Sequence, residues 1–157
     1  LVFEHMAAAA LGIEPTEFGG QAIANIFNAF SRTNIQIPAD LASHLASAAV
    51  LCPVEALEAR HVAVILNAHA NLKLPPVPEL VAHATSVLEQ LRAPVGGQEV
   101  SLIAHAVAAL GLHIVPPAGP ALARRVWGLA ISVDARGWDA QALTTLLGAY
   151  AKIENPA

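Results

Sequence analysis

The amino-acid sequence predicts an all-α protein, an α-solenoid of about four helix-turn-helix repeats. Three observations lead to this fold class. Alanine and leucine, both strong helix formers, supply 34 and 20 of the 157 residues. Apolar residues make up 55% of the chain and charged residues only 13%, which excludes intrinsic disorder. Four segments of the chain also align with one another in a single helical register, as expected for a repeat architecture.

The aligned segments are 21–30, 60–69, 98–107 and 141–150, so successive copies start 39, 38 and 43 residues apart. Their apolar positions recur at i, i+3 and i+4, which places them on one face of an α-helix. The apolar columns are Ile23/Val62/Val100/Leu143, Ile26/Ile65/Ile103/Leu146 and Phe27/Leu66/Ala104/Leu147. A fourth column, Ala29/Ala68/Ala106/Ala149, is alanine in every copy, and we expect a neighbouring helix backbone to approach closely there.

The elements follow in chain order from this repeat. Residues 2–11 are expected to form the second helix of a repeat whose first helix is absent. The aligned segments are the first helices, and a second helix follows each of the first three. These second helices are expected near 38–50, 78–91 and 117–131, each with a proline at its first turn, where a missing N–H costs nothing. Residues 138–152 are expected to form the first helix of a further repeat, whose second helix would lie beyond Pro156.

This reasoning gives one array over residues 1–157, interpreted as a fragment of a longer chain. The repeats cover 16–54, 55–95 and 96–134, with partial repeats at 1–15 and 135–157. Each helix pair would bury part of its apolar face against the next pair. The alternative is a compact alanine-rich bundle, and the in-register repetition argues against it.

Several function classes are excluded by the sequence. Residues 100–123 carry no formal charge over 24 positions, but Pro116, Pro117 and Pro120 interrupt them, so we expect no membrane span. A single cysteine, Cys52, excludes a disulfide framework. The closest histidine pairs are eight residues apart rather than three or four, so we expect no metal site. No catalytic constellation or cofactor motif stands out, and the protein is not expected to be an enzyme.

The first-helix motif carries a family resemblance. Residues 18–32 read Phe-Gly-Gly-Gln-Ala-Ile-Ala-Asn-Ile-Phe-Asn-Ala-Phe-Ser-Arg, and residues 64–72 and 146–153 follow the same pattern, while the third copy departs from it at Leu102 and Ala109. The motif resembles the octotricopeptide and heptatricopeptide repeats of organellar RNA-associated proteins, which also occur beside FAST-kinase-like and RAP domains. The resemblance implies a mitochondrial protein, with a plastid as the alternative. It also implies RNA as a partner, either ribosomal RNA or an organellar transcript, together with ribosomal proteins in some members.

A polar stripe is predicted opposite the apolar face of each first helix. In the first copy it comprises Gln21, Asn25, Asn28 and Arg32, at i, i+4, i+7 and i+11. Stacking the copies would align such side chains into a ladder that can hydrogen-bond to splayed bases. The candidate RNA- or partner-binding residues are Asn25, Asn28, Arg32, Arg60, Asn67, Asn71, His105, Arg124, Arg125, Thr145 and Lys152.

A structural interpretation of the same residues stays open. Recurring Asn and Gln side chains can tie a helix to its neighbour, so the Asn28/Asn67 and Gln21/Gln98/Gln141 columns are candidate inter-repeat clasps. The chain has only 8 Lys and Arg against 12 Asp and Glu, a net charge of −4 that does not favour phosphate binding. Three roles therefore compete: a structural component of a mitochondrial ribosome, a transcript-binding factor, and a HEAT-like protein–protein scaffold without RNA contact.

Overall fold

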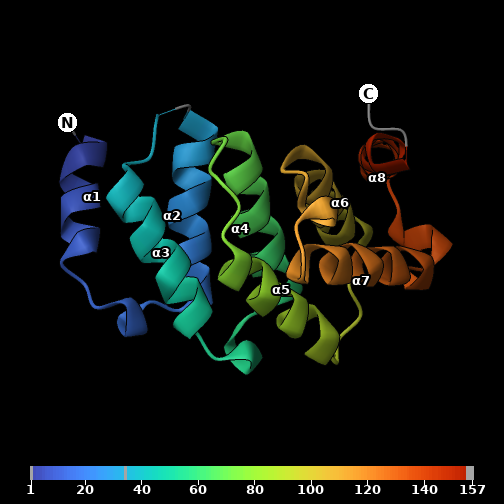
Figure 1. The fold of residues 1–157 in the computed structure, drawn as a ribbon, viewed down its shortest axis with the longest axis horizontal. Helices are drawn as coiled ribbons and strands as arrows, with labels where there is room; N and C mark the ends of the chain where they lie inside the picture. The colour runs from blue at the N-terminus through green and yellow to red at the C-terminus, as the bar shows by residue number, and fades with distance from the viewer. Residues whose placement is uncertain (1, 34, 155–157) are drawn as a thin grey trace.

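The computed structural model describes residues 2–33 and 35–154, and all regular structure in these residues is helical. The prediction of an all-α fold is confirmed. Eight α-helices follow one another along the described chain (Figure 1). They are α1 (Val2–Leu11), α2 (Gly20–Thr33), α3 (Ala39–Leu51), α4 (Ala59–Asn71), α5 (Pro78–Gln90), α6 (Gly97–Ala109), α7 (Ala118–Ser132) and α8 (Ala140–Glu154). Pro156, beyond which the partner of the last helix was expected, lies outside the described residues.

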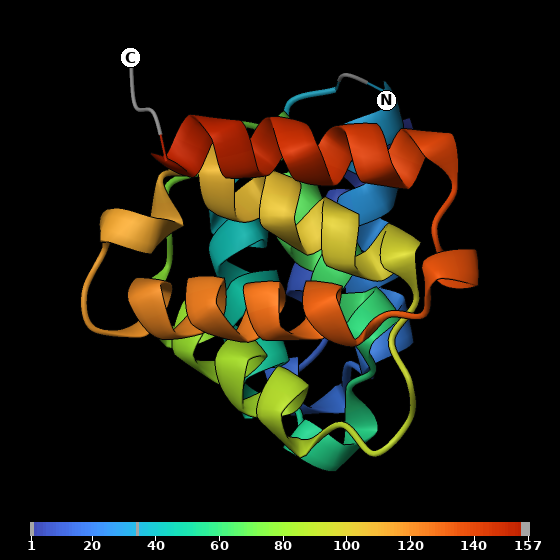
Figure 2. The same ribbon diagram turned by 90° about the vertical axis from the view of Figure 1, so that its right-hand side faces the viewer.

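The helices form two rows, as a helical-repeat stack requires. The even-numbered helices pack in the order α2, α4, α6, α8, and we call them the A helices. The odd-numbered helices pack in the order α1, α3, α5, α7, and we call them the B helices. Figure 2, which looks along the array from the α8 end, shows α8 and α6 lying above α7 and α5. The predicted alternation of first and second helices is therefore present in space as in sequence.

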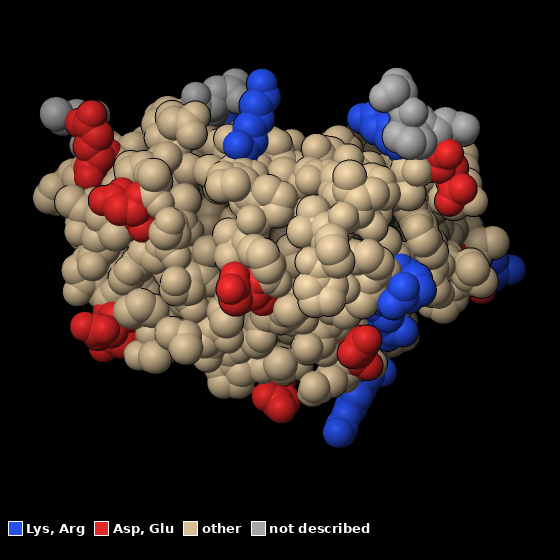
Figure 3. Space-filling view, viewed as in Figure 1, with Lys and Arg blue, Asp and Glu red and all other residues tan. Residues whose placement is uncertain are grey.

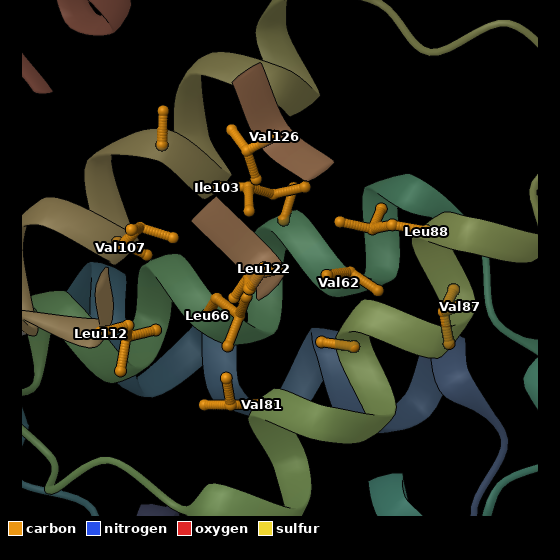
Figure 4. Close-up of a cluster of buried hydrophobic side chains, with 14 of the residues drawn as sticks. Val62, Leu66, Val81, Val87, Leu88, Ile103, Val107, Leu112, Leu122 and Val126 are labelled. Atoms are coloured by element: carbon orange, nitrogen blue, oxygen red, sulfur yellow. The ribbon is translucent and has the colours of Figure 1, made fainter. Parts of the chain in front are cut away.

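Two apolar clusters fill the space between the rows. One contains side chains from α1 to α5, with Ile23, Phe27, Leu41 and Leu45 fully buried. The other runs from α4 to α8, and Figure 4 shows its side chains converging from α4, α5, α6 and α7. Helix α4 contributes to both clusters, with Ile65 in the first and Leu66 in the second. The core is thus a chain of neighbour contacts rather than one central nucleus.

The alanine column behaves as predicted in three copies and differently in the first. Ala68, Ala106 and Ala149 are buried, whereas Ala29 is exposed. Ala68 of α4 lies in the cluster that contains the buried side chains of α2, and Ala149 of α8 lies in the cluster that contains those of α6, as expected if this column faces the preceding A helix. Within the described residues no A helix precedes α2, and Ala29 therefore faces solvent. The expectation of a close helix at Ala29 is wrong for this reason.

Short 3-10 helices precede three of the A helices and were not predicted. They are η1 (Pro15–Glu17), η2 (Val54–Ala56) and η4 (Ala135–Gly137), while η3 (Leu112–Ile114) lies between α6 and α7. The uncharged stretch 100–123 is accordingly divided among α6, η3 and α7. Over the part of the chain that the structure describes, no helix combines the length and the apolarity needed to cross a bilayer.

Candidate functional site

The predicted polar stripe lies on the open side of the A helices. Its sixteen positions are four per helix, and every one is exposed or partly exposed, whereas the apolar positions between them are mostly buried in α2, α4 and α6. The positions are Gln21, Asn25, Asn28, Arg32, Arg60, Val64, Asn67, Asn71, Gln98, Leu102, His105, Ala109, Gln141, Thr145, Gly148 and Lys152. Because successive A helices pack side by side, these four short stripes lie beside one another.

The stripe residues of α2 and α4 differ in how they are held. Gln21 Nε2 donates to Asn25 Oδ1 at 2.9 Å, a contact within α2 rather than between repeats. Asn71 Nδ2 donates to Ser31 Oγ at 3.1 Å and so joins α4 to α2. An inter-repeat contact is therefore found at Asn71, which was predicted as a binding residue, while Gln21 does not make the inter-repeat contact expected of it. Asn28 and Asn67 are both partly exposed.

A second inter-repeat contact joins α6 to the start of α8. Gln98 Nε2 donates to Asp139 Oδ2 at 3.2 Å, and the clasp interpretation of Gln98 is confirmed. The other carboxylate oxygen of Asp139 accepts the backbone N–H of Ala142 at 2.7 Å, as an N-cap residue does. These two contacts, the backbone one first, lower the pKa of Asp139 below the usual carboxyl value. The carboxylate is thereby kept in the charged form that both contacts require.

Arg60 and His105 are stripe residues of the two inner A helices, α4 and α6. The Arg60 guanidinium pairs with the Glu58 carboxylate, with Nε 3.0 Å from Oε2, and both side chains remain mostly exposed. An exposed pair of this kind contributes little stability and can exchange its carboxylate for another anion. Burial, followed by the nearby charge of Lys152, lowers the pKa of His105. His105 is therefore neutral at pH 7 and offers a hydrogen bond rather than a charge.

The two arginines of the basic pair Arg124-Arg125 have different surroundings in the structure. Arg124 is exposed on α7. Arg125 donates from Nε and Nη2 to the Leu88 carbonyl near the end of α5, at 2.9 and 2.7 Å. His44, at the matching place on α3, likewise contacts the Ile13 carbonyl just past α1 at 2.8 Å. The members of this column on α3 and α7 thus link their helices to the preceding part of the B row, whereas the buried Nε2 of His83, the member on α5, has no hydrogen-bond partner. The prediction that Arg125 binds RNA or a partner does not fit its contact with Leu88.

The charge of the stripe differs from that of the whole chain. None of the sixteen positions is Asp or Glu, although the chain has 12 acids, and three of them carry a cation: Arg32, Arg60 and Lys152. Lys73, which follows α4 and was not predicted, adds a further exposed cation near the same ends of the A helices. Figure 3 shows basic atoms at two places along the upper edge of the molecule, with acidic atoms at the left and right ends of that edge. Below the edge, only acidic atoms are seen on the left half of the face, and acidic and basic atoms lie together at its lower right.

The buried histidines take part in the packing of the array. His69 lies against the Phe27 ring with 4.7 Å between ring centroids, and its Nδ1 contacts the Ile65 carbonyl at 2.9 Å. Burial lowers the pKa of His69 and of His61, so both are neutral inside the array. Within the described residues no three His, Cys, Asp or Glu side chains gather as metal ligands would.

No protein-family model matches the chain, and neither a curated protein nor a solved structure is significantly similar to it. The class that the geometry defines is a stacked helical-repeat protein with an open polar face. The resemblance of its first-helix motif to octotricopeptide and heptatricopeptide repeats stays a prediction.

Proposed function

We propose that this chain is a non-enzymatic RNA-associated repeat protein that holds single-stranded RNA along the polar stripe of its A helices. The observation that supports the proposal is the composition of the stripe. Of sixteen solvent-accessible positions across four stacked helices, twelve hold seven amides, one imidazole, one hydroxyl and three cations, and none holds a carboxylate; the other four are Val64, Leu102, Ala109 and Gly148. Such a surface favours an anionic partner with many hydrogen-bonding edges, and RNA has both properties.

The candidate residues take different roles in this proposal. Arg32, Arg60 and Lys152 contact phosphates, with Arg60 exchanging Glu58 for the RNA. Asn25, Asn28, Asn67 and Thr145 hydrogen-bond to base edges, and neutral His105 stacks on a base or hydrogen-bonds to it. Asn71 and Arg125 are engaged in inter-helix contacts and are assigned to the scaffold. Arg124, on the B row, is an outlying phosphate contact.

The setting proposed for this activity is an organelle, a mitochondrion first and a plastid second. It rests on the resemblance of the first-helix motif. The protein is either a structural component of the mitochondrial ribosome or a factor for particular transcripts. The neutral side chains Val64 and Leu102 interrupt the ladder, and this supports a ribosomal role over a base-by-base code.

The experiment that tests RNA binding is a salt titration with a labelled single-stranded RNA of mixed sequence. Arg32→Ala with Lys152→Ala should weaken binding at every salt concentration. Losing two phosphate contacts should also reduce the slope of log K against log salt by about 1.4. The matched control is Arg92→Ala with Arg136→Ala, which removes the same charge from exposed residues outside the stripe. Unchanged affinity in the first variant, or equal loss in both, would refute the stripe as the RNA-binding surface.

A protein–protein scaffold is the second candidate. It is favoured by the partly exposed Val64 and Leu102 in the centre of the stripe, since apolar side chains amid polar ones suit a protein contact. Gentle purification of the native protein followed by sequencing of bound RNA separates the candidates. Stoichiometric ribosomal RNA indicates a ribosomal component, and a few enriched messengers indicate a transcript factor. Absence of RNA indicates the scaffold.

A further inference from the structure

An apolar groove lies between α3 and α5, on the row of B helices. Its volume is about 400 Å³, within the range of pockets that hold small ligands, and its surface is mostly apolar. Ala46, Val50 and Leu51 of α3 and Val77, just before α5, form the apolar part of its lining. Leu51 is 56% exposed, although α3 has a B helix on each side. The groove therefore belongs to the inner part of the array and does not result from a missing neighbouring helix.

Packing of the array does not require an apolar side chain at the position of Leu51. Helices α3 and α5 are both 13 residues long and begin 39 residues apart, so Leu51 corresponds to Gln90 at the end of α5. Gln90 is exposed, and the exposed Glu89 beside it corresponds to Val50. The same repeat positions are thus polar at the end of α5 and apolar in the groove. Apolar side chains gathered on an accessible inner surface, where the repeat itself allows polar ones, indicate contact with a partner.

The chain segments that form the groove contain acids but no Lys or Arg. Residues 35–59 hold three Asp and Glu, and residues 74–91 hold two. Glu79 lines the groove at the first turn of α5 and is exposed, and Asp40 lies on the same face of α3 as the lining residue Ser47, at i and i+7. Below the upper edge, Figure 3 shows only acidic atoms in the left half of the face, the half in which Figure 1 places α3. The surroundings of the groove therefore favour a cationic partner.

We propose that this groove docks a basic segment of another protein, which inserts aliphatic side chains between α3 and α5 and places Lys or Arg beside Glu79 and Asp40. The aliphatic side chains lose their contact with water in a concave apolar site and supply most of the affinity. The flanking cations set the orientation of the segment and speed its association. The same carboxylates repel the phosphates of nucleic acid, so this groove is not a second RNA surface. The proposal does not depend on whether the polar stripe of the A helices binds RNA.

The proposal is tested by amide chemical shifts of the isotope-labelled whole chain, titrated with three synthetic peptides of equal length. The first peptide carries two leucines flanked by lysines, the second has glutamates in place of the lysines, and the third has serines in place of the leucines. The first should give saturable shifts at Ser47, Leu51 and Glu79. The second should give no shifts, and the third should bind at least about tenfold more weakly than the first.

Several outcomes of these titrations would overturn the proposal. They are the absence of saturable shifts with the first peptide, shifts confined to residues outside the groove, and equally tight binding of the second or third peptide. Shifts of the groove residues when the protein alone is concentrated would show that a second copy of the chain occupies the groove, and would also overturn it.

Two substitutions with matched controls locate the binding site. Ser47→Trp fills the groove and Glu79→Lys reverses the charge at its edge, and each should weaken binding of the first peptide by about tenfold or more. The controls are Ser86→Trp, in the column of Ser47 on α5, and Glu89→Lys, at an exposed acid near the other end of α5. Both controls should bind within about twofold of the wild type. Equal losses in the controls and in the groove variants would contradict the proposed site. The titrations contain no RNA, so their outcome is independent of the proposed function.

Discussion

Helices α4 and α8 occupy the same place in the repeat but differ in their surroundings. The columns that hold Val62, Leu66 and His69 in α4 hold Leu143, Leu147 and Tyr150 in α8. All three are buried in α4 and all three are exposed in α8. Helix α4 has A helices on both sides and α5 beneath it, whereas α8 packs on α6. The comparison shows that burial here is decided by stacked neighbours, and that the residue type alone does not decide it.

The largest contrast expected is between Leu66→Ala and Leu147→Ala, the same substitution in the same column. Leu66 is fully packed, so its truncation should lower the free energy of unfolding by about 2–5 kcal/mol. Leu147 is solvent-exposed, and its truncation should change the value by less than about 0.5 kcal/mol in the monomer. Denaturant titration at low protein concentration measures both. Similar losses in the two variants would show that α8 is covered in solution.

The glycines of α6 and α8 should give changes of opposite sign. A Cβ on Gly97 would lie 2.6 Å from the Gly137 carbonyl oxygen and 2.7 Å from the Trp138 ring. Gly97→Ala should therefore destabilise the fold by about 1–3 kcal/mol through overpacking. A Cβ on Gly148 meets nothing within 4 Å, and Gly148→Ala should stabilise α8 by about 0.5–1 kcal/mol. Thermal unfolding of the two variants beside the wild type is the measurement, and stabilisation by Gly97→Ala would contradict the close approach of α6 to η4.

The neighbouring arginines of α7 should differ by a smaller amount. Arg125→Ala removes two charge-assisted bonds to the Leu88 carbonyl and should cost about 1–2 kcal/mol. Arg124→Ala, at an exposed position, should stay within about 0.5 kcal/mol of the wild type. The difference in stability is measured from the midpoints of the denaturant unfolding curves, provided that the curves of the two variants have equal slopes. Equal midpoints for the two variants would mean that the link between α5 and α7 adds no stability.

The mildest contrast concerns the pH dependence of stability at His69. Burial lowers the pKa of His69 in the folded chain below the ordinary value of 6.5. On acidification through pH 6.5 the unfolded chain therefore takes up a proton that the folded chain does not, and stability falls as the pH drops. His69→Leu should reduce the slope of stability against pH between pH 7.5 and 5. A slope equal to that of the wild type would show that His69 does not contribute to this dependence.

The fold was largely predictable because it follows from the periodic spacing of apolar residues along the sequence. The apolar columns at i, i+3 and i+4 identified every A helix, and the prolines identified the starts of α3, α5 and α7. Ala29 and Gly97 were not predictable from periodicity. The exposure of Ala29 depends on which helix precedes α2 in space, and the need for glycine at 97 depends on how closely η4 approaches α6.

The candidate site was predicted as a surface but not in its detailed contacts. Helical spacing placed the sixteen stripe positions on one accessible side. Spacing could not show that Asn71 reaches Ser31 or that Arg125 reaches Leu88, because these partners lie 40 and 37 residues away in the chain. Lys73 was missed since it follows the helix rather than belonging to it. Whether the stripe binds RNA is decided by the salt titration.

The membership of α4 and α5 in both apolar clusters has a consequence for how the chain opens: Ile65 and Leu80 belong to the first cluster, and Leu66 and Val81 to the second. A helix that belongs to two neighbouring cooperative units is released only when both have come apart. Amide protons of α4 and α5 should therefore exchange with solvent more slowly than those of α1 and α8, each of which is held by one unit. Opening would then proceed inward from both ends, and the pair of α4 and α5 would be the last part of the array to separate.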